Sequence, residues 1–220
     1  MLELRWAGER LLLLPQRAAA LPDRLTLLVA DAHIGKAAAF GRLGVPVPEA
    51  TTRAALARLD AAIEATGARH VIFLGDLLHS AAVHAAQARA AVACWRQTRP
   101  SIGLVLVRGN HDRRAGDPPS EWGVTCVEEP WPLGQLLLRH EPDPDPQRPG
   151  VAGHVHPGVV LGGRAHQRLR LPCFHLRHRQ LLLPAFGEFT GLQPMPRMAG
   201  DRIFAIAGDA VRELPAPTLG

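Results

Sequence analysis

Apolar positions in two segments of the chain recur with a helical period. In residues 48–67, Leu56, Leu59 and Ile63 lie three and four positions apart, and a glycine follows at the end of the segment, which predicts an amphipathic helix. The Ala-rich residues 80–98 predict a second helix, which has Val92 and Trp95 on one side and ends before Pro100. These two segments are the helical part of the expected fold.

Nine shorter apolar runs have the length of β-strands. They cover residues 25–30, 70–74, 102–107, 135–139, 158–161, 173–176, 181–183, 203–207 and 211–214. The early runs alternate with the helices, as in a parallel sheet with helical crossovers, whereas the later runs are typical of antiparallel hairpins. The sequence therefore predicts a mixed α/β layered fold. Since 220 residues with 47% hydrophobic content fill one core and are few for two, we expect a single domain over residues 1–220.

The composition indicates in which cellular compartment the protein lies and whether it associates with a membrane. No apolar run approaches the roughly 18 residues of a membrane span, and the run RLLLLP at residues 10–15 is short for a signal peptide. Cys94, Cys126 and Cys173 form no CxxC pair, which argues against a disulfide framework and a thiolate zinc site. We expect no membrane association and a place in the reducing cytoplasm. The oligomeric state stays open.

The excess of basic residues is concentrated in one segment. The chain has 25 Lys and Arg against 20 Asp and Glu, for a net charge of +5. Residues 164–179 contain no acidic residue and five arginines, which are Arg164, Arg168, Arg170, Arg177 and Arg179. Such a stripe can bind phosphates by releasing counterions. A solvated strand surface is an equally good interpretation.

Side chains that bind metals follow four of these runs and the short apolar pair Val151–Ala152. They are Asp31 and His33; Asp76 and His79; Asn110, His111 and Asp112; His140; and His154 and His156. Ligand sites of α/β sheets assemble at the carboxyl ends of strands, where loops carry polar groups over a rigid support. We therefore expect these clusters to converge in space.

The types of donor atom restrict which metal ions can bind and which reaction they can support. Carboxylate, amide and imidazole donors without a thiolate suit Mn, Fe, Ni or Zn. Seven donors exceed what one catalytic ion with an open position needs, so two ions sharing a carboxylate are the economical arrangement. Two such ions about 4 Å apart lower the pKa of a bridging water and hold the attacking and leaving oxygens of a phosphoester in line. The sequence therefore predicts phosphoryl chemistry.

The order and spacing of these motifs resemble a known superfamily. DAH, GDLLH, GNHD, His140 and GHVH, between residues 31 and 156, are similar to the DxH, GD, GNH(D/E), H and GHxH pattern of the calcineurin-like metallophosphoesterases. More narrowly, DAHIGKAAAF, FLGDLLHS, VRGNHD, GHVHPGVVLGG, RLPCF and LLLPAFGEFTG resemble the bacterial ligase-associated DNA-damage-response endonucleases of the PdeM type.

The resemblance implies a four-layer α/β fold, with two mixed β-sheets packed face to face and flanked by helices. It also implies roles for individual residues. Asp31, His33 and His156 would hold the first ion, Asn110, His140 and His154 the second, and Asp76 would bridge them. His111 would act as general acid. Among divalent metals, Mn is the first expectation for both ions.

One motif departs from the superfamily. Many of its phosphatases have GDxxDRG, whereas residues 75–80 here are GDLLHS. This segment therefore lacks both the acid that would orient the catalytic histidine and the arginine that would bind phosphate. Protein phosphatase activity is less expected for this reason. We expect Asp112 or His79 to orient His111, and Lys36, Arg113 or Arg114 to supply positive charge. Ordinary loop charge is an equally good interpretation of these last three.

These observations give an expected function and two alternatives. The first is a divalent-metal-dependent phosphodiesterase, a DNA endonuclease of DNA repair, in which a hydroxide bridging two ions attacks phosphorus in line. The resemblance adds a functional association with a DNA ligase and a helicase. A small-substrate phosphodiesterase or pyrophosphatase would use the same site. A non-catalytic scaffold on the same fold is disfavoured, because His111 and all seven donors are retained.

Overall fold

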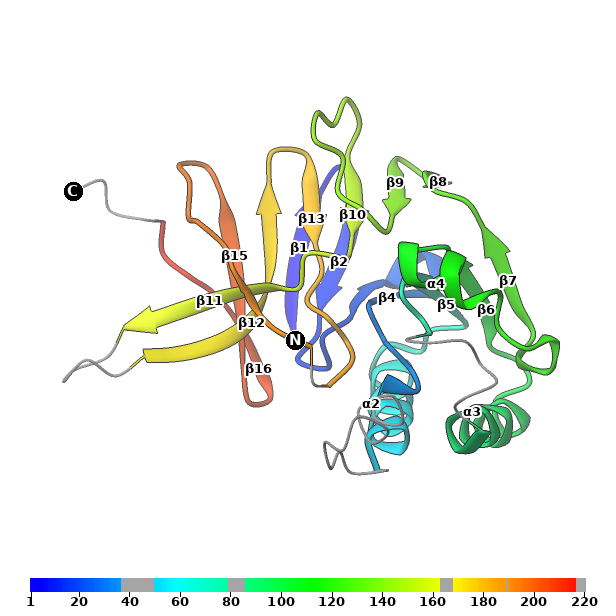
Figure 1. Ribbon diagram of the computed structural model, residues 1–220. Coiled ribbons are helices and arrows are strands. Elements are labelled where there is room, and N and C mark those ends of the chain that lie inside the picture. Colours follow the sequence, from blue (N-terminus) through cyan, green and yellow to red (C-terminus); the bar gives the residue numbers. More distant parts are fainter. Residues whose placement is uncertain (37–49, 79–85, 163–167, 189, 217–220) are drawn as a thin grey trace.

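The strands form two sheets in the computed structural model, which describes residues 1–36, 50–78, 86–162, 168–188 and 190–216 (Figure 1). The first sheet has seven strands in sequence order: β1 (Leu2–Trp6), β2 (Glu9–Leu13), β3 (Ala19–Leu21), β4 (Thr26–Ala30), β5 (His70–Leu74), β6 (Gly103–Val107) and β7 (Val124–Val127). Strands β1 to β4 pair antiparallel, and β4 to β7 pair parallel.

The second sheet has nine strands, of which seven follow the order β14-β11-β12-β13-β10-β9-β8, while β15 pairs with β12 and β16. Their bounds are β8 (Trp131–Leu133), β9 (Leu136–Arg139), β10 (Gly150–Ala152), β11 (Pro157–Gly162), β12 (Arg168–Arg177), β13 (Gln180–Leu182), β14 (Gln193–Pro194), β15 (Arg202–Ala207) and β16 (Ala210–Glu213). The prediction of antiparallel hairpins is confirmed for β11–β12, β12–β13 and β15–β16. Strand β10, which was not among the predicted runs, runs parallel to both β9 and β13.

The helices are α2 (Ala50–Thr66), α3 (Ala86–Thr98) and the short α4 (Asn110–Ala115), with 3₁₀ turns η1 (Pro22–Arg24) and η3 (Ser120–Trp122). The two predicted helices are therefore confirmed. Their expected first residues, 48–49 and 80–85, lie outside the described part of the chain. Among the helices that the structure describes, none is long and apolar enough to cross a membrane.

The first sheet has an apolar core on each face because its central strands are apolar at consecutive positions. Leu27 and Phe73 belong to a cluster that contains residues of α2 and α3, whereas Leu28 and Leu74 belong to a cluster shared with the second sheet, which includes Phe174. Helices, first sheet and second sheet therefore stack as layers. Burial on both faces is typical of parallel strands, which explains why β4 is buried along its whole length. The α/β fold with two mixed sheets is confirmed.

His175 on β12 gives the protein a pH-dependent stability. Its side chain is fully buried, and its Nε2 lies 2.8 Å from Asp201 Oδ2. Burial lowers the pKa of His175 from 6.5, an effect that Asp201 partly offsets. Below pH 6.5 the unfolded chain takes up a proton that the folded chain resists, so this contribution to stability is present above that pH and is lost as the pH falls.

We therefore expect wild type to lose up to about 1.4 kcal/mol more unfolding free energy than His175→Gln between pH 7.5 and pH 5.5. Chemical denaturation at the two pH values measures this difference. Only the pH dependence is compared, so a lower absolute stability of the variant does not affect the result. Equal losses in the two proteins would contradict the prediction.

Candidate active site

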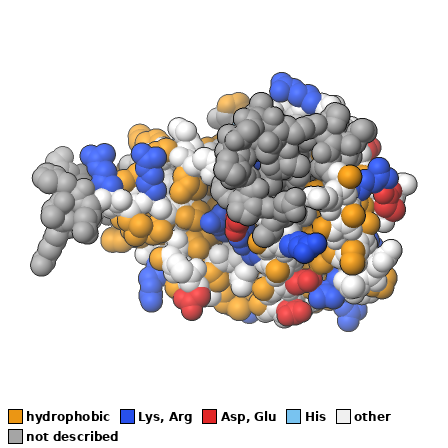
Figure 2. Space-filling view, turned by 60° about the horizontal axis from the view of Figure 1, so that its bottom comes forward, with side chains coloured by type: hydrophobic (Ala, Val, Ile, Leu, Met, Phe, Trp, Pro, Cys, Tyr) orange, Lys and Arg blue, Asp and Glu red, His pale blue; other side chains and the backbone are white. Residues whose placement is uncertain are grey.

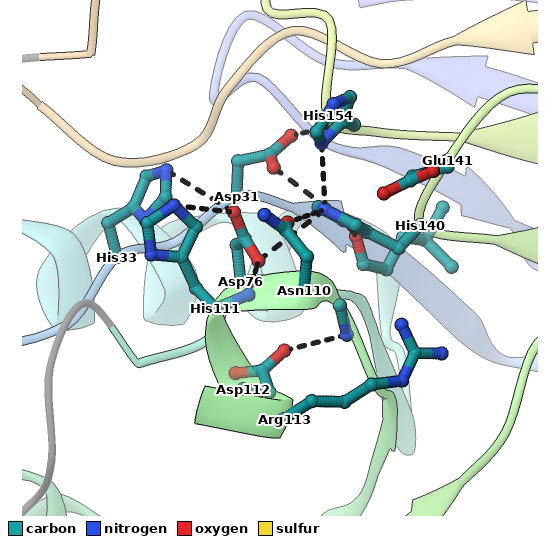
Figure 3. A network of polar contacts seen from close by, with 12 residues as sticks. Asp31, His33, Asp76, Asn110, His111, Asp112, Arg113, His140, Glu141 and His154 are labelled. Atoms are coloured by element: carbon teal, nitrogen blue, oxygen red, sulfur yellow. Dashed lines mark hydrogen bonds and ion pairs between the residues drawn. The ribbon is translucent and has the colours of Figure 1, made fainter. Parts of the chain in front are cut away.

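Both sheets contribute loops to one cluster of polar side chains (Figure 3). Asp31 and His33 follow β4, Asp76 follows β5, Asn110 and His111 begin α4 after β6, His140 follows β9, and His154 and His156 lie between β10 and β11. Strands β4, β5 and β6 are parallel, so their carboxyl ends lie at the same edge. The structure thus brings all seven predicted metal ligands and His111 together.

Backbone hydrogen bonds hold the loops in place. The His33 N–H donates to the carbonyl of Asp76 at 2.8 Å, and the Ile34 N–H donates to Leu77 at 2.8 Å. These bonds extend the pairing of β4 and β5 beyond the strands themselves. From the second sheet, the His154 N–H donates to Asp31 Oδ2 at 2.8 Å. The cluster is therefore tied together across both sheets.

Five of the seven predicted ligands have left-handed backbone conformations. Their φ angles are 53° at Asp31, 46° at His33, 50° at Asp76, 67° at His154 and 52° at His156. Positive φ is uncommon for residues other than glycine, and such residues gather at functional sites where surrounding structure holds them. The loops thus accept local strain to place these side chains.

Two motif glycines allow the close approach of the loops. A Cβ on Gly75 would lie 2.1 Å from His140 Nδ1, and one on Gly109 would lie 2.6 Å from Asp76 Oδ1. A side chain at either position would displace a predicted ligand. This packing explains why glycine precedes the polar residues in the GD and GNHD motifs.

Gly109 offers a test of this packing, since its φ of −92° is open to any residue. We expect Gly109→Ala to weaken metal binding by about 10- to 100-fold, the usual cost of disturbing the support of a ligand. Titration calorimetry of the metal-free protein with Mn²⁺ measures the affinity. The control is Gly191→Ala, where an added Cβ meets nothing within 4 Å. Equal affinities in the two variants would contradict the prediction.

The donor atoms fall into two groups that have Asp31 in common. One ligand atom each from Asp31, His33 and His156 lies within 4.8 Å of the others, and the same holds for Asp31, Asp76 and His140. The Asp76 carboxylate faces both groups, because its Oδ2 is 4.0 Å from His33 Nε2 and its Oδ1 is 3.4 Å from His140 Nε2. This position suits a carboxylate shared by two ions.

Asn110 and His154 complete the second group around His140. Asn110 Oδ1 lies 2.9 Å and His154 Nδ1 lies 3.0 Å from His140 Nε2. On the other side of the ring, His140 Nδ1 lies 3.1 Å from the carbonyl oxygen of Leu74. A carbonyl oxygen can only accept, so Nδ1 carries the hydrogen and a neutral ring presents a lone pair at Nε2. That lone pair faces the oxygens of Asn110 and Asp76.

These donors fit divalent cations. Lone pairs of nitrogen and oxygen that face one another repel unless a cation lies between them, and a second hydrogen bond that fixes the ring is the usual support of a metal-bound histidine. Asp31 Oδ1 is buried and accepts no hydrogen bond from the residues that the structure describes, which is costly for a carboxylate without a cation. Oxygen and imidazole donors without thiolate suit the metals predicted from the sequence.

His111 lies at the edge of the cluster that solvent reaches. Its N–H donates to Asp76 Oδ1 at 3.1 Å, and its Nε2 lies 3.9 Å from Asp76 Oδ2. The side chain is 36% exposed, whereas that of Asp76 is 4% exposed. The ring therefore lies beside the donor groups and remains accessible to a substrate.

Asp112, predicted to orient His111, is engaged with the backbone in the structure. Its Oδ2 accepts from Gly109 at 2.9 Å and its Oδ1 accepts from Leu78 at 3.2 Å. Burial raises the pKa of this carboxyl, and these two hydrogen bonds oppose the shift. Asp112 thus joins the loop after β5 to the start of α4. The other candidate for orienting His111, His79, lies outside the described residues.

The three residues predicted to supply positive charge differ in their burial and in their ion pairs. Lys36 is half-buried, and burial lowers the pKa of its ammonium while the charges of Asp31 and Asp76 raise it. Arg113 is paired with Glu128 and Glu129, at 3.3 and 3.4 Å. Exposed Arg114 has no ion pair among the described residues. Lys36 is therefore the cation whose electrostatic coupling to the donor cluster is evident.

Two supports of the cluster were not predicted from the sequence. Glu129 Oε2 accepts the N–H of His140 at 2.7 Å. Near the other group, the Gly187 N–H donates to the carbonyl of Asp31 at 3.0 Å, and Arg58 donates to the carbonyl of Phe186 at 2.6 Å. Only the resemblance of LLLPAFGEFTG to the narrower family marked this last segment, since no local pattern indicates a contact across 156 residues.

The fold and the donor cluster are those of a metal-dependent phosphoesterase. Among solved structures, the chain is similar to nuclease MPE of Pseudomonas putida, with 43% identity over 97% of this chain and 99% of that chain and a TM-score of 0.84. The chain belongs to the metallophosphoesterase family, as its motifs predict, and is an enzyme of this class.

Other comparisons are more distant or negative. The chain is also similar to YfcE, a phosphoesterase from E. coli, with 15% identity, coverage of 87% of this chain and 99% of that chain, and a TM-score of 0.43. Models of known protein families and curated proteins give no match.

Proposed function

We propose that this chain is a divalent-metal-dependent phosphodiesterase that cleaves DNA as an endonuclease. The observation that carries the proposal is the convergence of seven oxygen and nitrogen donors from loops of both sheets, with His111 beside them. A nucleic acid is the proposed substrate because the similar protein from Pseudomonas putida is a nuclease and aligns over almost the whole chain. DNA in particular is proposed because the motifs resemble those of the ligase-associated DNA endonucleases.

Each predicted ligand has a proposed place. Asp31, His33 and His156 would hold one divalent ion, Asn110, His140 and His154 a second, and Asp76 would contact both. Two bound divalent ions would supply a water of lowered pKa as nucleophile and would neutralise charge on the phosphoryl oxygens. Mn²⁺ is our first choice, and Fe, Ni or Zn would suit the same donors.

The protein side chains then act on substrate and proton. His111 donates a proton from its ring to the leaving oxygen of the sugar, for which its accessible position beside Asp76 is suited. Asp76 also holds the backbone of His111, so the proton donor and the donor cluster keep a fixed relation. Lys36 adds positive charge that favours the entry of a phosphodiester. In this proposal Asp112 is a positioning residue.

The test is a cleavage assay on the full-length protein after removal and return of metal. We expect cleavage of circular single-stranded or gapped DNA with Mn²⁺ and none after chelation, and cutting of a circle establishes endonuclease activity. Asp31→Asn protein from the same purification controls for a contaminating nuclease. Turnover of a small phosphodiester without cleavage of DNA would instead assign a small-substrate phosphodiesterase.

We further propose a biological setting. A role in DNA repair, next to a DNA ligase and a helicase, rests on the resemblance of the motifs between Asp31 and Gly191 to the ligase-associated endonucleases. A cytoplasmic location is supported by the free thiols of Cys94, Cys126 and Cys173. The whole sequence would act as one domain.

A further inference from the structure

A two-stranded arm extends from the candidate active site. Strand β11 begins at Pro157, directly after the predicted ligand His156, and pairs antiparallel with the first part of β12. The third neighbour, β14, pairs only with Pro157 and Gly158, at the base of the arm. The outer part of the arm, residues 159–162 and 168–171, is therefore a ribbon that projects from the body of the protein (Figure 1).

The two faces of this arm differ. Val159 and Leu171 pair on one face and pack with the cluster that contains Ile203 of β15. The opposite face carries Arg168 and Arg170, both exposed, which pair with Gly162 and Val160. The apolar face thus fixes the base of the arm, and the arginine face is left toward solvent.

The arginines of the arm have no acidic partner among the described residues. Elsewhere arginines such as Arg108 and Arg202 form ion pairs with carboxylates at 2.7 Å. The arm contains no acidic residue, and Figure 2 shows Lys and Arg side chains on the projecting end of the molecule without an acidic group beside them. Unneutralised, exposed guanidinium groups are suited to phosphate, which they bind in a bidentate geometry.

The distance from the active site suits contacts to a flanking strand. At about 3.3 Å per residue, Arg170 lies about 13 Å and Arg168 about 20 Å along the ribbon from His156. A DNA strand in a duplex advances about 3.4 Å per nucleotide, so the two arginines would reach phosphates about four to six nucleotides from the scissile bond. A small phosphodiester cannot span this distance.

We propose that the arginine face of the β11–β12 arm binds the phosphate backbone of DNA that flanks the cleavage site. This inference rests on the proposed function and adds where the substrate is held. Contacts of this kind carry no sequence information, so the arm would increase affinity for DNA of any sequence.

The test compares Arg168→Ala/Arg170→Ala with wild type. The control is Arg69→Ala/Arg148→Ala, two exposed arginines that precede β5 and β10, at the opposite ends of strands whose carboxyl ends form the site. Turnover of bis-p-nitrophenyl phosphate and of a 20-nucleotide DNA is measured with Mn²⁺. DNA binding is measured by fluorescence anisotropy at several salt concentrations in a His111→Gln background, which keeps the metal ligands.

We expect the arm variant to raise the Kd for DNA roughly tenfold and to lower the salt slope by about 1.4 to 1.8, the value for two phosphate contacts. The arm variant should turn over the small phosphodiester as fast as wild type does. The arm variant and wild type should also cleave trinucleotides equally. Unchanged DNA binding, or an equal loss on both substrates, would overturn the inference. If wild type bound DNA without cleaving it and the arm variant bound DNA more weakly, the proposed function would be refuted, whereas DNA binding by the arm would be supported.

Discussion

Asp76→Asn is expected to lower kcat/KM for phosphodiester hydrolysis by about a thousandfold or more, the order of the several kcal/mol that divalent ions contribute to the transition state. The carboxylate faces both donor groups, with Oδ2 4.0 Å from His33 Nε2 and Oδ1 3.4 Å from His140 Nε2. Asparagine keeps an oxygen that accepts the N–H of His111 but removes the negative charge. The fold is therefore retained while the binding of two cations is lost.

Metal stoichiometry separates this explanation from a folding defect. Elemental analysis should find close to two ions per wild-type chain and fewer in Asp76→Asn, and Mn²⁺ should raise the Tm of the variant less than that of wild type. Asp209→Asn, an exposed carboxylate in the turn between β15 and β16, is the matched control and should behave like wild type. Full activity in Asp76→Asn would contradict the shared-carboxylate arrangement.

The site was predictable from the sequence because each of its motifs follows a strongly apolar strand. The run Thr26–Ala30 precedes Asp31, and His70–Leu74 precedes Asp76, so strand ends and ligands are adjacent in the sequence. Parallel pairing of β4, β5 and β6 then places those ends at one edge, as the rule for α/β sheets requires. Local pattern and topology together accounted for the convergence.

Other elements escaped prediction for identifiable reasons. The first three strands were not recognised: β1 is buried at a single position, Leu4, and β3 contains two alanines, which have low strand propensity. Helix α4 has six residues, too few to show a helical period. The direction of β10 depends on the path of the loop before it, and a strand of three residues carries no sign of direction.

The supports of the ligands were missed because they are tertiary contacts that no local sequence pattern marks. Glu129 holds the N–H of His140 from a segment before β8, and Gly187 reaches Asp31 from the far end of the chain. Asp112 was recognised as important, yet its hydrogen bonds to Gly109 and Leu78 show a role in joining loops that its place in GNHD does not reveal. Spacing along the chain can identify donors, whereas their support depends on tertiary structure.

His111→Gln is expected to lower kcat for DNA cleavage by about 10²- to 10⁴-fold, the usual contribution of a general acid. Glutamine preserves the N–H that donates to Asp76 Oδ1 and a polar side chain at the 36% exposed position, but it cannot transfer the proton. Metal binding should be unchanged, since His111 is not among the proposed ligands. The variant should therefore lose kcat for DNA cleavage while it binds as much metal as wild type.

The leaving group distinguishes proton donation from other roles of His111. The sugar alkoxide released from DNA is strongly basic and needs a proton, whereas p-nitrophenolate is a weak base that leaves without one. The loss in His111→Gln should therefore fall below about tenfold on bis-p-nitrophenyl phosphate. An equally large loss on both substrates would indicate that His111 stabilises charge on the phosphoryl group instead. Unchanged DNA cleavage would mean that the activity belongs to a contaminant, and the scaffold alternative would then replace the catalytic proposal.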